Sequence, residues 1–305
     1  VDWADKDVCS AEERTLLTIT KTFPVTTSPA MEVTWKSSSG EIQTGVLKFF
    51  DRRVSPKFRG GKRAPYGSHV EACWQKLVQS GEARELFELI SQNGFCKKFD
   101  LSTFTSIKLG SKVPTADTWQ TAAKKEGFLQ CKALEQWKNE IRVYEQLQSL
   151  QGESVPKFYG STSFQLDVPS GPDPNFFQIG GILIQRINGF SLNRIFAKEQ
   201  LLTDDVDWPL VCQRTMDAST KINQLGVLHS STHFGNIIVQ PSSMQPFIFD
   251  FGASRLRSDF KSEDKFRVAV DLYREPESWV RVLIIHIKST FGLSLKIESL
   301  QPEDE

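Results

Sequence analysis

Three polar side chains whose types suit phosphate or metal chemistry stand around two short apolar runs. His229 and Asn236 precede the run 237–239, and Asp250 directly follows the run 246–249. Short apolar runs separated by a polar turn are typical of a β-hairpin of buried strands. Because the two ends of a hairpin meet, we expect Asn236 and Asp250 at one end of a small sheet. Amide and carboxylate oxygens suit Mg²⁺, which prefers few protein carboxylates together with substrate phosphates.

Together these residues resemble the catalytic core of the protein-kinase-like superfamily, whose pattern is H-R-D-x-x-x-x-N, then a hairpin, then D-F-G. Residues 229–231 read H-S-S where H-R-D is expected, Asn236 coincides with the Asn, and Asp250 opens D-F-G. The resemblance implies that Asn236 and Asp250 hold Mg²⁺ and that Ser231 replaces the catalytic Asp. A serine hydroxyl has no useful basicity near neutral pH, so Ser231 cannot serve as the proton acceptor.

The elements that must position these residues begin with three β-rich runs, 16–20, 31–35 and 45–50. In a kinase-like small lobe they are the first three strands, and a glycine-rich phosphate loop lies between the first two. Here the segment 23–29 contains two prolines and no glycine. Since proline lacks an N–H donor and stiffens the chain, we do not expect a backbone cradle for phosphates.

The run 45–50 reads G-V-L-K-F-F and resembles the V-A-I-K strand of the family. The resemblance implies that Lys48 contacts nucleotide phosphates and pairs with a helix glutamate. The alternative is an edge-strand lysine that faces water. Apolar residues at three- and four-residue spacing predict the partner helix over 132–150. Glu140 is the chosen partner and Glu135 the fallback, since side chains five residues apart cannot both face one cleft; alternatively, both are exposed helix charges.

Residues 51–130 are expected to form an insertion before that helix, an order associated with fungal-type kinase-like proteins. The insertion opens with six basic residues, Arg52, Arg53, Lys57, Arg59, Lys62 and Arg63. A basic, glycine-rich loop can hold an anionic partner, but a solvated loop is the preferred interpretation. Apolar spacing over 70–93 predicts a helical segment in which Gly81 is a break.

The run 182–189, I-L-I-Q-R-I-N-G, resembles the fifth strand and hinge of a kinase. The resemblance implies that Ile184 is the gatekeeper and that the backbone of Gln185 and Ile187 meets adenine. The expected fold is therefore α+β and bilobal. An antiparallel-sheet small lobe with a helical insertion spans 1–188, and a truncated, mainly helical large lobe spans 189–305.

Composition narrows the class of protein. The 305 residues carry a formal net charge of zero, so no global field points to nucleic acid or a membrane. Five cysteines are scattered without CxxC spacing, which favours reduced thiols in a cytosolic or nuclear protein. No apolar run is long enough to span a membrane. The basic segment lacks an aromatic stacking motif, which also argues against a nucleic-acid partner.

The predicted function is that of a pseudokinase, which binds ATP and Mg²⁺ and acts through a protein partner. A general base raises the reaction rate by about 10²–10⁴-fold, so loss of the Asp makes catalysis poor rather than impossible.

The alternative function is that of an active small-molecule or protein phosphotransferase, or another nucleotide-dependent transferase. His233 would then be a non-standard base, although a surface histidine is the preferred interpretation. The run 274–277, R-E-P-E, is similar to the A-P-E end of an activation segment. A coincidence is the preferred interpretation of this similarity.

Overall fold

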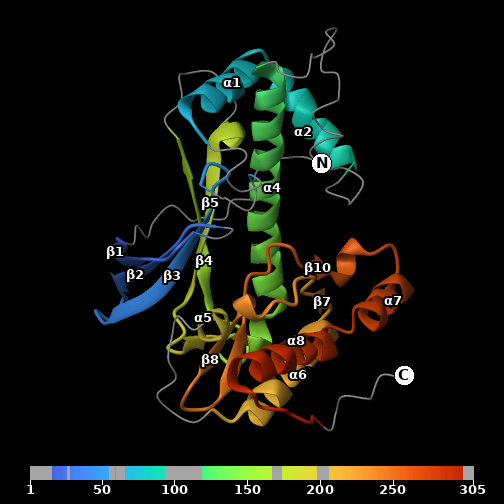
Figure 1. Ribbon diagram of the computed structural model, residues 1–305. Helices are drawn as coiled ribbons and strands as arrows, with labels where there is room; N and C mark the ends of the chain where they lie inside the picture. The colour runs from blue at the N-terminus through green and yellow to red at the C-terminus, as the bar shows by residue number, and fades with distance from the viewer. Residues whose placement is uncertain are drawn as a thin grey trace. The chain divides into compact units, whose positions relative to one another are not determined.

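The computed structural model describes residues 16–25, 28–54, 59, 66–93, 119–166, 174–197 and 206–297. The chain is mixed α/β, with antiparallel strands and long helices (Figure 1). It divides into two compact units. Unit 1 contains the described residues up to Trp137 together with Tyr159–Leu183, and unit 2 contains Lys138–Phe158 and the described residues from Ile184 onward. This division departs from the predicted lobes over 138–158 and 184–188.

The main sheet has the strand order β1-β2-β3-β5-β4. Its strands are β1 (Thr18–Thr22), β2 (Ala30–Lys36), β3 (Ile42–Phe50), β4 (Phe158–Gln165) and β5 (Gln178–Gln185). The three predicted N-terminal strands are thus confirmed, and β2 pairs with β3 in an antiparallel register that sets Ala30 opposite Lys48. Because β3 has a neighbour on each side, Lys48 lies on an interior strand, and the edge-strand alternative is wrong.

A helical layer of unit 1 is formed by α1 (Ser68–Gln79), α2 (Glu82–Asn93) and the first part of α4 (Trp119–Gln146) (Figure 1). Gly81 separates α1 from α2 with a φ of +82°, which confirms the predicted break. The three helices share an apolar core around Trp74, which is fully buried. At Gly127 of α4 an added Cβ would lie 2.5 Å from the Leu86 side chain, so the close packing of α2 on α4 requires a glycine there.

The predicted start of the pairing helix at residue 132 is wrong, because α4 begins at Trp119. Two consecutive lysines followed by Glu126 and Gly127 interrupt the apolar spacing in this part of the helix. The tertiary packing of Ala123, Phe128 and Leu129 keeps it helical. The predicted end of the insertion, at residue 130, therefore falls inside a continuous helix.

Unit 2 contains the rest of α4 and most of the C-terminal elements. Its strands form two small sheets, with the orders β6-β8-β9 and β10-β7. The elements are η2 (Gln148–Leu150), β6 (Phe190–Ser191), α5 (Leu192–Phe196), α6 (Trp208–Gln224), β7 (Val227–Leu228), η4 (Phe234–Asn236), β8 (Ile237–Gln240), β9 (Gln245–Ile248), β10 (Arg255–Leu256), η5 (Arg257–Asp259), α7 (Glu263–Tyr273) and α8 (Glu275–Phe291). In the part of the chain that is described, no helix combines the length and apolarity needed to cross a membrane.

Candidate functional site

The β8–β9 hairpin brings Asn236 and Asp250 to the same end of its sheet. The register pairs Ile237 with Ile248, and the Phe249 N–H donates to the Asn236 carbonyl at 3.1 Å. Asn236 precedes β8 and Asp250 follows Phe249, and both are half-buried. Asp250 has a left-handed φ of 70°, a conformation that is uncommon outside glycine and often found at functional sites. The predicted hairpin is confirmed.

The loop before Asn236 is held by a carboxylate that the sequence pattern did not identify as functional. Glu275, at the start of α8, is 1% exposed. Its oxygens accept hydrogen bonds from the backbone N–H of His229 at 2.9 Å and of Ser230 at 2.6 Å. The Asn223 side-chain amide donates to the same carboxylate at 3.0 Å. Glu275 therefore stabilises Ser230 in its left-handed conformation, with a φ of 59°. In the sequence, Glu275 belongs to the run 274–277, whose similarity to the A-P-E motif was interpreted as a coincidence.

His229 is a buried support of the loop. Its Nε2 lies 3.0 Å from the Phe249 carbonyl, which fixes the proton on Nε2. Burial lowers the pKa of His229, so the imidazole stays neutral near pH 7. The ring packs against Phe251 at 5.0 Å and edge-on to Trp279 at 5.4 Å. With these contacts His229 joins the loop to the segment after β9 and is 1% exposed.

Ser231 and Asn236 contact each other directly. The Asn236 Nδ2 lies 3.2 Å from the Ser231 carbonyl and 3.4 Å from its hydroxyl. These bonds orient the amide and leave Oδ1 as the oxygen for a cation. One amide oxygen and one carboxylate, both half-buried, form a donor set that fits Mg²⁺ with substrate phosphates. Among the described residues, no group of three or more His, Cys, Asp or Glu side chains is arranged to hold a metal ion.

His233 is exposed and stacks on Phe234, with ring centroids 4.4 Å apart. Its Nδ1 accepts a hydrogen bond from the Gly235 N–H at 2.9 Å. The neutral ring therefore carries its proton on Nε2, which makes Nε2 a donor rather than a proton acceptor. This geometry does not favour the role of general base.

The segment after Asp250 is fastened to α4. The Asn139 side-chain amide lies 3.3 Å from the Phe251 carbonyl, 3.2 Å from that of Gly252 and 2.8 Å from that of Ser254. The Phe251 ring meets the Tyr144 ring edge to face at 5.5 Å. The Ser254 hydroxyl also donates to the His229 carbonyl at 3.2 Å. The loop, the hairpin end and α4 therefore form one connected cluster within unit 2.

The two glutamates proposed as partners of Lys48 differ sharply in burial. Glu140 is 0% exposed, whereas Glu135 is exposed. The alternative that both are exposed helix charges is therefore wrong for Glu140. Lys48 is half-buried, and its ammonium lies 5.0 Å from the Phe50 ring centroid. The pairing of Lys48 with Glu140 stays a prediction.

The residues predicted to form the hinge are largely covered. Ile184 and Ile187 are buried, and the Gln185 N–H donates to the Lys157 carbonyl at 2.8 Å. The Ile187 carbonyl accepts a bond from the Arg186 guanidinium. Two backbone groups of this segment are thus engaged within unit 2, and the contact with adenine stays a prediction.

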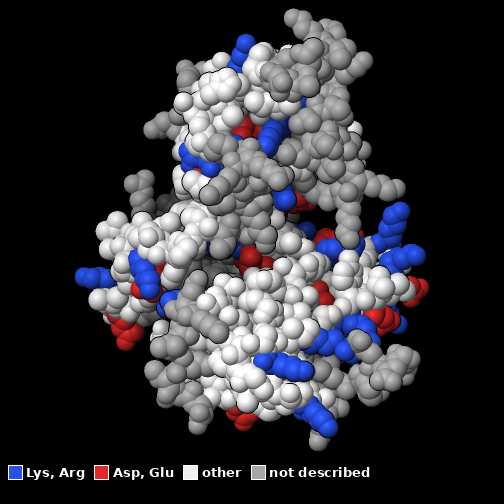
Figure 2. Space-filling model, in the orientation of Figure 1, with Lys and Arg blue, Asp and Glu red and all other residues white. Residues whose placement is uncertain are grey.

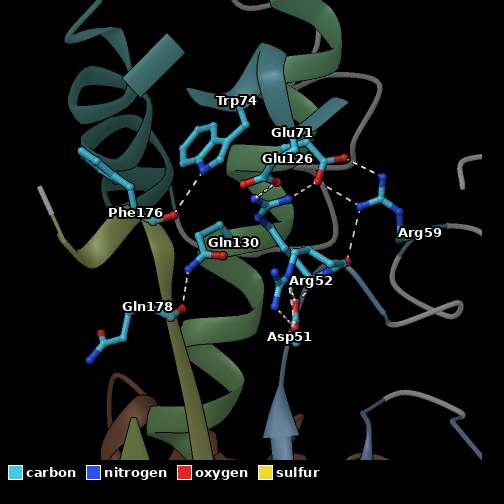
Figure 3. A network of polar contacts seen from close by, with 10 residues as sticks. Asp51, Arg52, Arg59, Glu71, Trp74, Glu126, Gln130, Phe176 and Gln178 are labelled. Atoms are coloured by element: carbon cyan, nitrogen blue, oxygen red, sulfur yellow. Dashed lines mark hydrogen bonds and ion pairs between the residues drawn. The ribbon is translucent and has the colours of Figure 1, made fainter. Parts of the chain in front are cut away.

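Arg52 and Arg59 of the basic segment after β3 are neither solvated nor open to an anionic partner (Figure 3). Arg52 and Arg59 are 2% and 5% exposed. Both contact Glu126 of α4, Arg59 at 2.6 Å and 2.9 Å, and Arg52 also contacts Glu71. Arg53 forms a two-pronged ion pair with Asp51. Both interpretations of the basic loop are corrected for Arg52 and Arg59, since buried charges require such partners; Arg53 is half-buried. Lys57, Lys62 and Arg63 lie outside the described residues.

Among the described residues, neither the charge on the face shown in Figure 2 nor the cysteines indicate another site. On the face shown in Figure 2, acidic and basic side chains of the described residues are mixed in small groups. Cys73, Cys131 and Cys212 are free thiols, and burial raises the pKa of Cys212 to about 12. A thiol with so high a pKa is a poor nucleophile and metal ligand. Cys9 and Cys96 lie outside the described residues.

Comparison with known proteins does not add a family to this geometry. No protein-family model matches the sequence, and no curated protein sequence matches it.

Proposed function

We propose that the chain is a kinase-like protein of the pseudokinase type, which binds ATP with Mg²⁺ and acts through a protein partner. The proposal depends on one observation: Asn236 and Asp250 meet at one end of the β8–β9 hairpin, and Asn236 bonds to Ser231. In phosphoryl transfer the protein mainly positions groups, and the metal neutralises much of the charge. Two metal ligands beside a serine, where a proton acceptor is needed, favour binding over efficient transfer.

Other features support a kinase-like arrangement. Lys48 lies on an interior strand of an antiparallel sheet, as a phosphate-binding lysine of this family would. Glu140 is a fully buried carboxylate on the long helix α4, and a buried carboxylate requires a compensating partner. Burial of Ile184 is in line with a gatekeeper position. A protein that retains nucleotide contacts but transfers poorly is expected to act by changing the conformation or assembly of a partner protein.

A thermal-shift titration with ATP and Mg²⁺ tests the binding half of this proposal. A ligand at 100 times its Kd stabilises the native state by about 2.7 kcal/mol, so we expect a clear rise in Tm for the unaltered chain. Asp250→Ala should abolish the Mg²⁺-dependent part of the rise, and Lys48→Ala should weaken the ATP-dependent part. The matched controls Asp271→Ala and Lys36→Ala alter exposed residues and should keep the full rise. Absence of any rise in the unaltered chain would contradict nucleotide binding.

The alternative, an active transferase, requires a proton acceptor other than Ser231. The Nδ1 of His233 already accepts the Gly235 N–H, so the structure does not favour that residue. Turnover of radiolabelled ATP distinguishes the two functions. We expect no turnover above the level of Asp250→Ala, whereas turnover that His233→Ala impairs would establish the transferase.

A further inference from the structure

The hydroxyl of Tyr144 is a buried polar group that has no hydrogen-bond partner in the described part of the chain. The side chain is 0% exposed. Its ring stacks on Phe158 at 5.4 Å and meets Phe251 edge to face at 5.5 Å. Contacts on two sides hold the ring, and with it the hydroxyl, in place. A buried hydroxyl without a hydrogen bond is costly, so a group that it can bind in another state of the protein would offset this cost.

Two carboxylates of unit 2 lie close enough to this hydroxyl for their charges to act on it. Glu140 lies four residues before Tyr144 on α4, so the two side chains share one face of the helix. Asp250 directly precedes Phe251, whose ring contacts Tyr144. Burial raises the pKa of Tyr144 well above its ordinary value, and the charges of Glu140 and Asp250 raise it further. The hydroxyl therefore keeps its proton and is suited to donate a hydrogen bond to an anionic oxygen.

The backbone on the Asp250 side of this contact is fixed. Asn139, next to Glu140 on α4, binds the carbonyls of Phe251, Gly252 and Ser254. These bonds keep the segment that begins at Asp250 against the helix that carries Tyr144. The backbone that follows Asp250 is thus held against α4 by contacts that involve neither the Asp250 nor the Tyr144 side chain.

We propose that the Tyr144 hydroxyl is a positioning group for the cation site: it donates a hydrogen bond to the Asp250 carboxylate when one oxygen of that carboxylate binds a divalent cation. The inference rests on the proposed function, in which Asp250 holds Mg²⁺. Carboxylates that bind metals are themselves hydrogen-bonded by neighbouring groups, and loss of such a group weakens metal binding by about 10–100-fold. Tyr144 thereby adds a determinant of cation affinity outside the resemblance to H-R-D and D-F-G.

The test uses the full chain and its Tyr144→Phe variant, with ATP affinity measured by calorimetry in excess Mn²⁺ and again in EDTA. For the unaltered chain we expect tighter binding with Mn²⁺. In Tyr144→Phe this Mn²⁺-dependent gain should fall by about 10-fold or more, while the affinity in EDTA stays unchanged. The Tm without ligand should be unchanged or higher, because the lost hydroxyl has no partner to leave behind. Tyr159→Phe, which removes the hydroxyl of a 43% exposed tyrosine in unit 1, is the control and should match the unaltered chain.

Each contrary result has a distinct meaning. An unchanged Mn²⁺-dependent gain in Tyr144→Phe overturns this inference and leaves the proposed function standing. A marked drop in Tm without ligand also overturns it, because the hydroxyl would then have a structural partner. If the unaltered chain binds ATP equally well in Mn²⁺ and in EDTA, the cation site and this inference both fall, and nucleotide binding remains. If ATP does not bind under either condition, the proposed function falls as well.

Discussion

Glu275 organises the candidate site although it lies far along the chain from the residues that it holds. One buried carboxylate accepts hydrogen bonds from the backbone of His229 and Ser230 and from the Asn223 amide. Hydrogen bonds to ionised groups are among the stronger ones in proteins. The loop that presents Ser231 and Asn236 is therefore anchored from α8, and its geometry depends on that helix.

Glu275→Ala should destabilise the protein strongly. The substitution leaves the buried His229 N–H without an acceptor, and such a group costs about 1–3 kcal/mol. It also removes one hydrogen bond each from the Ser230 N–H and from the Asn223 amide, which still donates to the Val227 carbonyl. We expect the free energy of unfolding, measured by urea denaturation, to fall by about 2 kcal/mol or more. Glu275→Gln keeps one acceptor oxygen and should show an intermediate loss.

The control for this substitution is Glu277→Ala on the same helix. The Glu277 carboxylate lies 3.6 Å from the guanidinium of Arg274, a half-exposed side chain, so its removal should change stability by about 0.5 kcal/mol or less. Equal losses for Glu275→Ala and Glu277→Ala would show that the bonds to the loop carry no special weight.

At the scale of elements, α4 contributes to both compact units. Its first part places Glu126 between Arg52 and Arg59 and packs Gly127 against Leu86. Trp137 donates to the Gly181 carbonyl of β5 at 3.0 Å. Its last turns bring Asn139 and Tyr144 to the segment after β9. A single helix thus organises the predicted insertion and supports the candidate metal ligand Asp250.

Glu126→Ala tests the buried ion pairs at the start of α4. The change leaves Arg52 and Arg59 buried beside one fewer carboxylate, and breaking a buried pair from one side costs about 3–5 kcal/mol. Urea denaturation should show a loss of that size. Glu153→Ala removes a 59% exposed partner of Lys221, and surface pairs contribute about 0–1 kcal/mol. A loss for Glu126→Ala no larger than for Glu153→Ala would contradict a structural role of the arginines.

At the scale of the whole molecule, the two units are interleaved along the chain. Unit 2 takes Lys138–Phe158 from a position before β4 and resumes at Ile184. This early segment supplies the bonds of Asn139, the ring of Tyr144 and the Ser154 carbonyl, which accepts the Ile248 N–H at 2.9 Å. A cut at residue 188 would therefore separate the hairpin from residues that fix it.

A fragment of residues 189–305 should not fold cooperatively, because it lacks these contacts. Thermal unfolding followed by circular dichroism is expected to show no sigmoidal transition for the fragment and a clear one for the full chain. A chain that joins 138–158 to 184–305 through a flexible linker restores the missing contacts and should regain the transition. A cooperative transition in the shorter fragment would disprove the dependence on 138–158.

The sequence by itself determined the local features of this protein. The β8–β9 hairpin, the polar residues at its end, the first three strands and the break at Gly81 follow from periodicity and turn chemistry over a few residues. Chain neighbours decide such patterns, so no distant partner is needed to predict them.

Only the tertiary structure decided the state of the charged and polar groups. From the sequence, Arg52 and Arg59 were assigned to a solvated basic loop. In the structure they are buried and paired with Glu126, which lies far along the chain. The sequence alone assigns no role to Glu275, whereas in the structure α8 places its carboxylate against the backbone of the His229 loop. In the sequence, Tyr144 is one of several apolar positions of a helix. Only the fold shows that its ring packs against Phe158 and Phe251 and that its hydroxyl is buried. The cost of burying a polar or charged group depends on its partners, and those partners are set by the fold rather than by sequence spacing.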